Sequence, residues 1–225
     1  MIIAIDGPSG AGKSTLGKLL AKNLNLLYLD TGAMYRAGAL AVLRFGVQFS
    51  DETETLEIVR NSRIELEGEP DALKVLLDGE NVSDEIRSLA VAQAASLVST
   101  NSAVRRRMVE LQRQLGEQAP NGCVLEGRDI GSVVFPNADI KFFLTAKPED
   151  RARRRFEEDQ AKGRTATFEQ TLAEINERDE RDVSRGDSPL TISDDAVVID
   201  TSELDLTEVF ELMLAKVREK RGAAA

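Results

Sequence analysis

Residues 1–15 read MIIAIDGPSGAGKST, and this stretch decides the fold of the chain. Its first half contains a short apolar run, Ile2–Ile5, that predicts a buried strand ending at Asp6. Its second half fits the pattern G-x-x-x-x-G-K-[ST] at every required position and leads into a helical apolar stripe between Leu16 and Leu24. A strand, a Gly-rich loop and a helix in this order predict a phosphate-binding loop.

The residue types of this loop explain why phosphate would bind there. The glycines let backbone N–H groups point inward, and the start of the helix adds the positive end of its dipole. Lys13 can reach the β- and γ-phosphates of a nucleotide, and the Ser14 hydroxyl can ligate Mg²⁺. We therefore expect ATP and Mg²⁺ as ligands, with Ser14 on the metal. The loop residues expected to bind ATP are Gly7, Pro8, Ser9, Gly10, Ala11, Gly12, Lys13, Ser14 and Thr15.

The rest of the chain extends an α/β pattern. Further strands are expected at 26–29, 123–125, 140–144 and 196–199, with helices between them, which predicts a parallel sheet with helices on both faces. Residues 62–84 instead alternate polar and apolar side chains between turn signals, so they predict a small antiparallel meander that is followed by a helix up to about residue 99. We interpret 1–61 and 99–225 as an α/β core that carries the phosphate loop and 62–98 as a small α+β insertion. The insertion is either a solvated surface hairpin or a subdomain that covers a substrate.

Composition excludes several classes of function. The chain has 225 residues, with 39 Asp and Glu against 29 Lys and Arg, and this acidic balance argues against wrapping of nucleic acid. Histidine is absent, so a Ser-His-Asp triad, an imidazole base and a His-based metal site are excluded. The single cysteine, Cys123, is expected in the core. We find no signal peptide and no apolar segment of membrane-spanning length, so we expect a cytoplasmic protein without membrane or nucleic-acid partners.

Two further strand ends carry candidate ligand-binding residues. The carboxyl ends of parallel strands line the ligand cleft of such sheets. After the second strand, Arg36 could bind a phosphate and Thr31 could hydrogen-bond a base, whereas Asp30 is expected to cap the next helix. After the strand at 123–125, Arg128 could bind a phosphate while Asp129 accepts from an amino group of a base. The alternative interpretation of Arg128 and Asp129 is a local ion pair.

Two charged helices complete the candidate site. Arg178, Asp182 and Arg185 are spaced i, i+4 and i+7, so a helix places them on one face, although a solvated salt-bridge helix has the same spacing. A second helix is strongly basic and precedes a Gly-containing loop, which suggests a lid whose arginines neutralise charge on a transferred phosphoryl group. The alternative is a solvated basic face, and four arginines on one helix cannot all face one ligand. These arginines are Arg151, Arg153, Arg154 and Arg155.

The sequence resembles the bacterial cytidylate kinase family from Ile2 to about Val217. Four stretches carry the resemblance: IDGPSGAGKS (5–14), LDTGAMYR (29–36), EGRDIGSVVFP (126–136) and ERDERD (177–182). The third stretch is the most specific of the four. The resemblance implies transfer of the γ-phosphoryl group of ATP to CMP or dCMP. We expect the protein to be a monomer. The resemblance also implies that 62–98 is a monophosphate-binding insertion and that 149–165 is a helical lid.

The resemblance further implies roles for individual residues. The cytosine would contact Thr31, Arg105, Asp129 and Arg185. The sugar would contact Ser96, Arg178 and Asp182, and the monophosphate would contact Arg36 and Arg128. Catalysis is assigned to Lys13, Arg128 and two lid arginines, Arg154 and Arg151. The family position matched by Thr31 is often Ser, and Thr keeps the hydroxyl while adding a methyl group.

Three other functions remain open at this point. One is a P-loop kinase for UMP, AMP or shikimate, but Arg128 and Asp129 favour a ligand with both a phosphate and an amino-bearing base. Another is an ATPase or nucleotide switch, which would not need the two further strand-end motifs. The third is a nucleic-acid binder, which the net charge of −10 and the absence of Trp disfavour.

Overall fold

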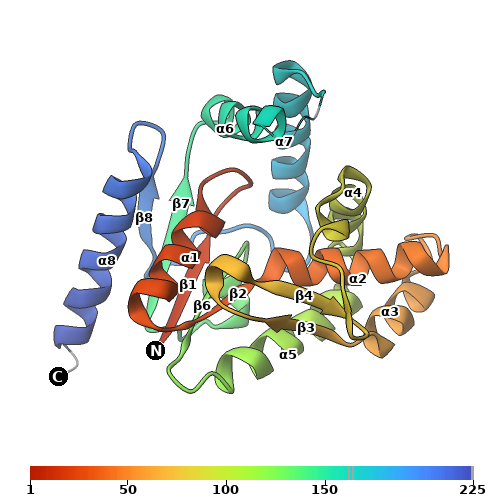
Figure 1. Ribbon diagram of the computed structural model, residues 1–225, viewed down its shortest axis with the longest axis horizontal. Helices are drawn as coiled ribbons and strands as arrows, with labels where there is room; N and C mark the ends of the chain where they lie inside the picture. The colour runs from red at the N-terminus through yellow and green to blue at the C-terminus, as the bar shows by residue number, and fades with distance from the viewer. Residues whose placement is uncertain (162, 164, 224–225) are drawn as a thin grey trace. The chain divides into compact units, whose positions relative to one another are not determined.

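The computed structural model describes residues 1–161, 163 and 165–223, which form two compact units (Figure 1). The first unit consists of Met1–Leu20 and the chain from Glu126 onward, and the second unit consists of Ala21–Leu125. Over the described part of the chain, no helix is both long and apolar enough to cross a membrane.

The first unit is built on parallel strands. β1 (Ile2–Asp6) pairs with β7 (Ile140–Thr145), and β7 pairs with β8 (Val197–Asp200), so these strands run side by side in Figure 1. The strand order of the whole larger sheet is β2-β6-β1-β7-β8. The helices that accompany these strands are α1 (Lys13–Leu24), the π-helical turn η3 (Ile130–Val134), α6 (Pro148–Ala161), α7 (Phe168–Ser184) and α8 (Leu206–Ala223). The predicted α/β fold with a parallel sheet is thereby confirmed.

The second unit contains the meander expected at 62–84. β3 (Ile64–Glu67), β4 (Lys74–Leu77) and β5 (Glu80–Asn81) form an antiparallel sheet in that order. The other strands of this unit are β2 (Leu27–Asp30) and most of β6 (Cys123–Gly127). Its helical segments are α2 (Thr31–Phe45), α3 (Glu52–Asn61), η1 (Pro70–Ala72), η2 (Glu85–Arg87), α4 (Leu89–Val98) and α5 (Ser102–Glu117).

The structure departs from the sequence-based expectation in three places. The helix expected over 84–99 is divided, because Ser88 has extended backbone and caps α4 by accepting from the N–H of Val91. The helix α3, capped by Asp51, and the π-helical turn η3 were not predicted at all.

The proposed lid at 149–165 is helical as far as Ala161, and it includes residues 162 and 164, which lie outside the described residues.

Close helix packing forms the core of the second unit. A Cβ added to Gly38 of α2 would lie 2.8 Å from the terminal methyl of Met108 on α5, so the small residue allows the two helices to approach. Val59 of α3 packs into the same cluster. Cys123 is fully buried, which confirms the prediction that it is a core residue.

Candidate active site

The loop between β1 and α1 has the backbone that a phosphate-binding loop requires. Gly7 and Gly10 have φ values of +143° and +78°, which side chains rarely adopt. A Cβ on Gly7 would lie 2.0 Å from the carbonyl oxygen of Leu144 in β7. Only glycine therefore fits at this point, and the loop passes directly over the end of the neighbouring strand.

Lys13 is the buried cation of this loop. Its Nζ donates to the carbonyl oxygen of Pro8 at 2.6 Å, so the side chain folds back over the loop. Burial, followed by the nearby Arg128 guanidinium, lowers the pKa of Lys13 to about 7, although Glu126 opposes this shift. Ser14, the next residue of α1, is exposed. The loop thus combines a desolvated amine with an accessible hydroxyl.

Arg151 of α6 joins the loop to two helices. Its Nε donates to the carbonyl of Ala146 at 2.9 Å, and its Nη1 donates to the carbonyl of Ser9 at 3.1 Å. Its Nη2 lies 2.6 Å from Oδ2 of Asp179 on α7. The loop packs so closely on α6 that a Cβ on Gly10 would lie 3.0 Å from Cβ of Arg151. In this structure Arg151 therefore contacts protein acceptors on all three sides of its guanidinium.

The other arginines of α6 have different neighbours. Arg154 donates from Nη1 to the hydroxyl of Thr201 at 2.9 Å and from Nη2 to its carbonyl. Arg155 pairs with Asp159 at 3.2 Å, one turn further along the helix, and Arg153 is exposed. The four side chains therefore diverge, and the catalytic roles of Arg154 and Arg151 stay predictions.

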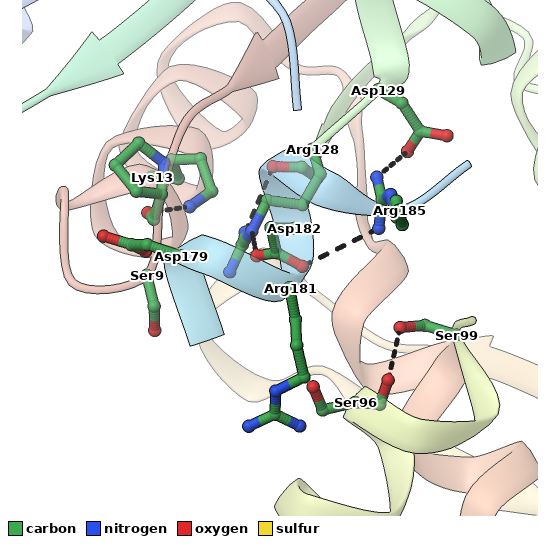
Figure 2. Close-up of polar contacts among 12 residues, drawn as sticks. Ser9, Lys13, Ser96, Ser99, Arg128, Asp129, Asp179, Arg181, Asp182 and Arg185 are labelled. Carbon is green, nitrogen blue, oxygen red and sulfur yellow. Dashed lines mark hydrogen bonds and ion pairs between the residues drawn. The ribbon is translucent and has the colours of Figure 1, made fainter. Parts of the chain in front are cut away.

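A buried network of alternating charges links the strand-end motif after β6 to α7 (Figure 2). Arg128 Nε donates to Asp182 Oδ2 at 2.7 Å, and Asp182 Oδ1 lies 3.7 Å from Arg185 Nη1. Arg185 Nη2 lies 3.9 Å from Asp129 Oδ1. None of the four side chains is more than 16% exposed, so a solvated helix face is excluded for Asp182 and Arg185. Arg128 thus pairs with Asp182 on α7, whereas the alternative interpretation was a local ion pair with the adjacent Asp129.

The charges around Asp182 favour its ionised form. Burial alone would raise the pKa of Asp182. The guanidinium groups of Arg128, Arg178 and Arg185 outweigh burial and hold this pKa below its ordinary value. The network therefore presents fixed charges of both signs on residues that were predicted to bind one ligand.

Asp6 is a site residue that the sequence interpretation missed. It is the last residue of β1, and its two carboxylate oxygens accept from the N–H groups of Ile130 and Gly131 at 2.8 and 2.7 Å. The rule that strand ends line the ligand cleft would have identified it. Asp179, which holds Arg151, was also missed, although it stands between the predicted site residues Arg178 and Asp182.

In the second unit, Asp30 and Thr31 begin α2. The Asp30 carboxylate accepts from the N–H of Ala33 at 2.7 Å, which confirms that it caps this helix. The other Asp30 oxygen lies 3.2 Å from Nη2 of Arg36, one turn into α2. Thr31 is buried beside the cap. The cap therefore also orients the arginine that was predicted to bind a phosphate.

Arg105 is the largest fully buried side chain of the second unit. Its guanidinium donates to the carbonyl of Ser99 at 3.2 Å and lies 5.7 Å from the centroid of the Tyr35 ring. The hydroxyl of Ser99 in turn donates to the carbonyl of Ser96, a bond drawn in Figure 2. The second unit thus has its own cluster of predicted substrate residues, and binding of one ligand by both clusters stays a prediction.

Comparison with known proteins identifies the family to which this chain is similar. The cytidylate kinase family matches this chain over residues 3–219. A cytidylate kinase from a Geobacter species is 47% identical over 98% of this chain and 94% of its own length. The cytidylate kinase of Pelotomaculum thermopropionicum is 49% identical over 97% of this chain and 96% of its own length.

A solved structure extends the comparison to the fold. An uncharacterized protein from Eubacterium ventriosum has a TM-score of 0.52 at 14% identity, and the match covers 97% of this chain and 98% of that one. This similarity supports the fold alone.

Proposed function

The chain belongs to the cytidylate kinase family, and we propose that the buried network around Arg128 and Asp129 binds its acceptor nucleotide. The enzyme transfers the γ-phosphoryl group of ATP to CMP or dCMP and forms ADP with CDP or dCDP. The residue assignment rests on the alternation of Arg128, Asp182, Arg185 and Asp129. Their side chains are at most 16% exposed, and all four lie in the unit that holds Lys13. Such a network is suited to a ligand that carries both a phosphate and a polar base.

ATP binds at the loop of residues 7–15 in this proposal, and Mg²⁺ accompanies it. No group of three or more His, Cys, Asp or Glu side chains that could hold a metal occurs in the described part of the chain. The exposed Ser14 hydroxyl would supply one ligand to a Mg²⁺ ion that takes most of its other ligands from nucleotide phosphates and water. The metal would neutralise charge on the β- and γ-phosphates.

The acceptor contacts are proposed for individual residues. Asp129 can accept from the exocyclic amino group of cytosine, which uracil lacks, and Arg185 would hold Asp129 in place. The remaining base contacts are proposed for Thr31 and Arg105. The sugar contacts are proposed for Ser96, Arg178 and Asp182. The monophosphate contacts are proposed for Arg36 and Arg128.

The chemistry needs no covalent intermediate and no strong base, because the acceptor is already a phosphate anion. Positioning and charge stabilisation by Lys13 and the arginines supply the catalysis. We propose that residues 62–98 cover the monophosphate and that 149–165 form the lid, so that water is kept from the phosphoryl group. The rest of the chain, 1–61 and 99–225, would be the kinase core of a monomer; residues 224–225 lie outside the described residues.

Kinetics of an Asp129→Ala variant test the base assignment. Loss of a hydrogen bond to a charged acceptor is expected to lower kcat/KM for CMP roughly 10- to 100-fold, while the Kd for ATP stays unchanged. The matched control is Glu177→Ala, which removes an exposed carboxylate from α7 and should leave both quantities unaltered. An equal loss for ATP and CMP would assign Asp129 to a structural ion pair instead.

A further inference from the structure

Asp6 makes a contact that connects two parts of the candidate site. Each of its two carboxylate oxygens accepts one backbone N–H, from Ile130 at 2.8 Å and from Gly131 at 2.7 Å. The two donors are consecutive residues that lie 124 and 125 positions away in the sequence. A carboxylate held by two successive N–H groups fixes both the distance and the orientation of the segment that donates them.

The segment held in this way directly follows the substrate-binding pair. Ile130 and Gly131 open the π-helical turn η3, and Asp129 is the residue immediately before it. The N–H groups at the start of such a turn have no partner within the turn, and Asp6 supplies one for each. Asp129 and Arg128 therefore emerge from a backbone that is anchored to the end of β1.

The backbone of Asp6 leads directly into the phosphate loop. Gly7, the first loop residue, follows Asp6 in the chain, and Lys13 and Asp129 both act electrostatically on the Asp6 carboxylate. Gly131 approaches so closely that an added Cβ would lie 2.9 Å from Cδ of Lys141 and 3.4 Å from Oδ2 of Asp6. The carboxylate thus sits in a tight position between the loop that would hold ATP and the residues that would hold the acceptor.

We propose that Asp6 is a positioning residue that fixes Arg128 and Asp129 relative to the phosphate loop. The inference rests on the proposed function of Asp129 as the residue that recognises the base. Asp6 itself touches neither substrate in this account. It acts by setting where the acceptor lies relative to the γ-phosphate, a distance on which phosphoryl transfer depends strongly.

The first test is an Asp6→Asn variant. Asparagine keeps the shape of the side chain but has one acceptor oxygen, so its NH₂ group must face one of the two backbone N–H donors. We expect kcat/KM for CMP to fall on the order of 100-fold while the Kd for ATP, measured without acceptor, stays unchanged. Equal weakening of ATP and CMP would overturn the proposal. The control is Asp139→Asn, because Asp139 accepts from the N–H of Ile2 at the opposite end of β1.

A second readout does not depend on activity. NMR hydrogen exchange of the Ile130 and Gly131 amides is expected to become about tenfold faster in the Asp6→Asn variant, with no change in amides of α8. Unchanged exchange at these two amides would show that Asp6 does not hold the turn. The exchange rates test whether Asp6 holds the turn, even if the Asp129→Ala kinetics show that Asp129 does not recognise the base.

A double variant of Asp6 and Asp129 distinguishes a failure of this inference from a failure of the proposed function. If Asp6 acts in part through Asp129, Asp6→Asn should lower kcat/KM for CMP by a smaller factor in the Asp129→Ala background than in the wild type. Losses that multiply would mean that Asp6 acts independently of Asp129, which contradicts the proposal.

If Asp6→Asn does not fold, Gly131→Ala perturbs the same contact from the opposite side. That variant is then expected to show the same selective loss for CMP, and equal losses for ATP and CMP would overturn the proposal.

Discussion

Replacing Asp182 by alanine removes the carboxylate that lies between Arg128 and Arg185. The pair with Arg128 is short, at 2.7 Å, and the side chains of Asp182 and Arg128 are only 9% and 16% exposed. Removal of one partner from a buried ion pair costs about 3–5 kcal/mol, because the remaining charge is left without compensation. Arg185 keeps Asp129 as a second partner at 3.9 Å, so we expect the loss near the lower end, about 3 kcal/mol.

Urea unfolding followed by far-ultraviolet circular dichroism measures this loss, since the chain has no Trp to report it by fluorescence. Glu177→Ala is the matched control on the same helix, because Glu177 is 70% exposed and pairs with Arg181 at 3.5 Å. Its free energy of unfolding should change by less than about 0.5 kcal/mol. The difference between the two variants then isolates the effect of burial.

The stability difference between wild type and Asp182→Ala should depend on pH in a defined direction. Because the pKa of folded Asp182 is lowered, its stabilising contribution is present above the ordinary value of 3.8 and is lost as the pH falls through the folded value. The stability gap between wild type and Asp182→Ala should therefore narrow in acid. A loss below about 1 kcal/mol at neutral pH, or a gap that widens in acid, would refute the reasoning.

Two further predictions concern the phosphate loop. Because the pKa of Lys13 is lowered to about 7, ATP should bind with uptake of a proton, and its affinity should fall as the pH rises through this value. Calorimetry in buffers of different ionisation enthalpy measures this uptake, and a binding enthalpy independent of the buffer would contradict it. Gly7→Ala should abolish ATP binding, because its Cβ would overlap the Leu144 carbonyl at 2.0 Å. Gly46→Ala, with φ +70° and open space around it, should cost about 1 kcal/mol of stability and leave ATP binding intact.

Features encoded by neighbouring residues could be predicted from the sequence. The phosphate loop, the cap formed by Asp30 and the antiparallel meander all depend on residues within a few positions of one another. Their patterns are therefore visible in a short window. Cys123 could be assigned to the core for the same reason, since it begins an apolar run.

Partners that lie far apart in the sequence could not be predicted in this way. Arg128 pairs with Asp182 at a separation of 54 residues, and Arg151 donates to Ser9 at a separation of 142. Which of several carboxylates an arginine meets depends on the register and stacking of whole elements. The helix α3 is different, because it is short and most of its residues are charged or polar, but its few apolar residues share one face and its cap Asp51 is adjacent, so a short window could have identified it.

The most direct test of the account is the rate of ADP formation from ATP and Mg²⁺ with a panel of acceptors. The panel comprises CMP, dCMP, UMP, AMP, GMP, shikimate and a reaction without acceptor. The account predicts fast turnover with CMP and dCMP and only slow turnover with the others. Asp129 is proposed to accept from the amino group of cytosine, which UMP and shikimate lack, whereas AMP and GMP carry their amino groups on larger purine bases. ADP formation without an acceptor, or a clear preference for another acceptor, would contradict it.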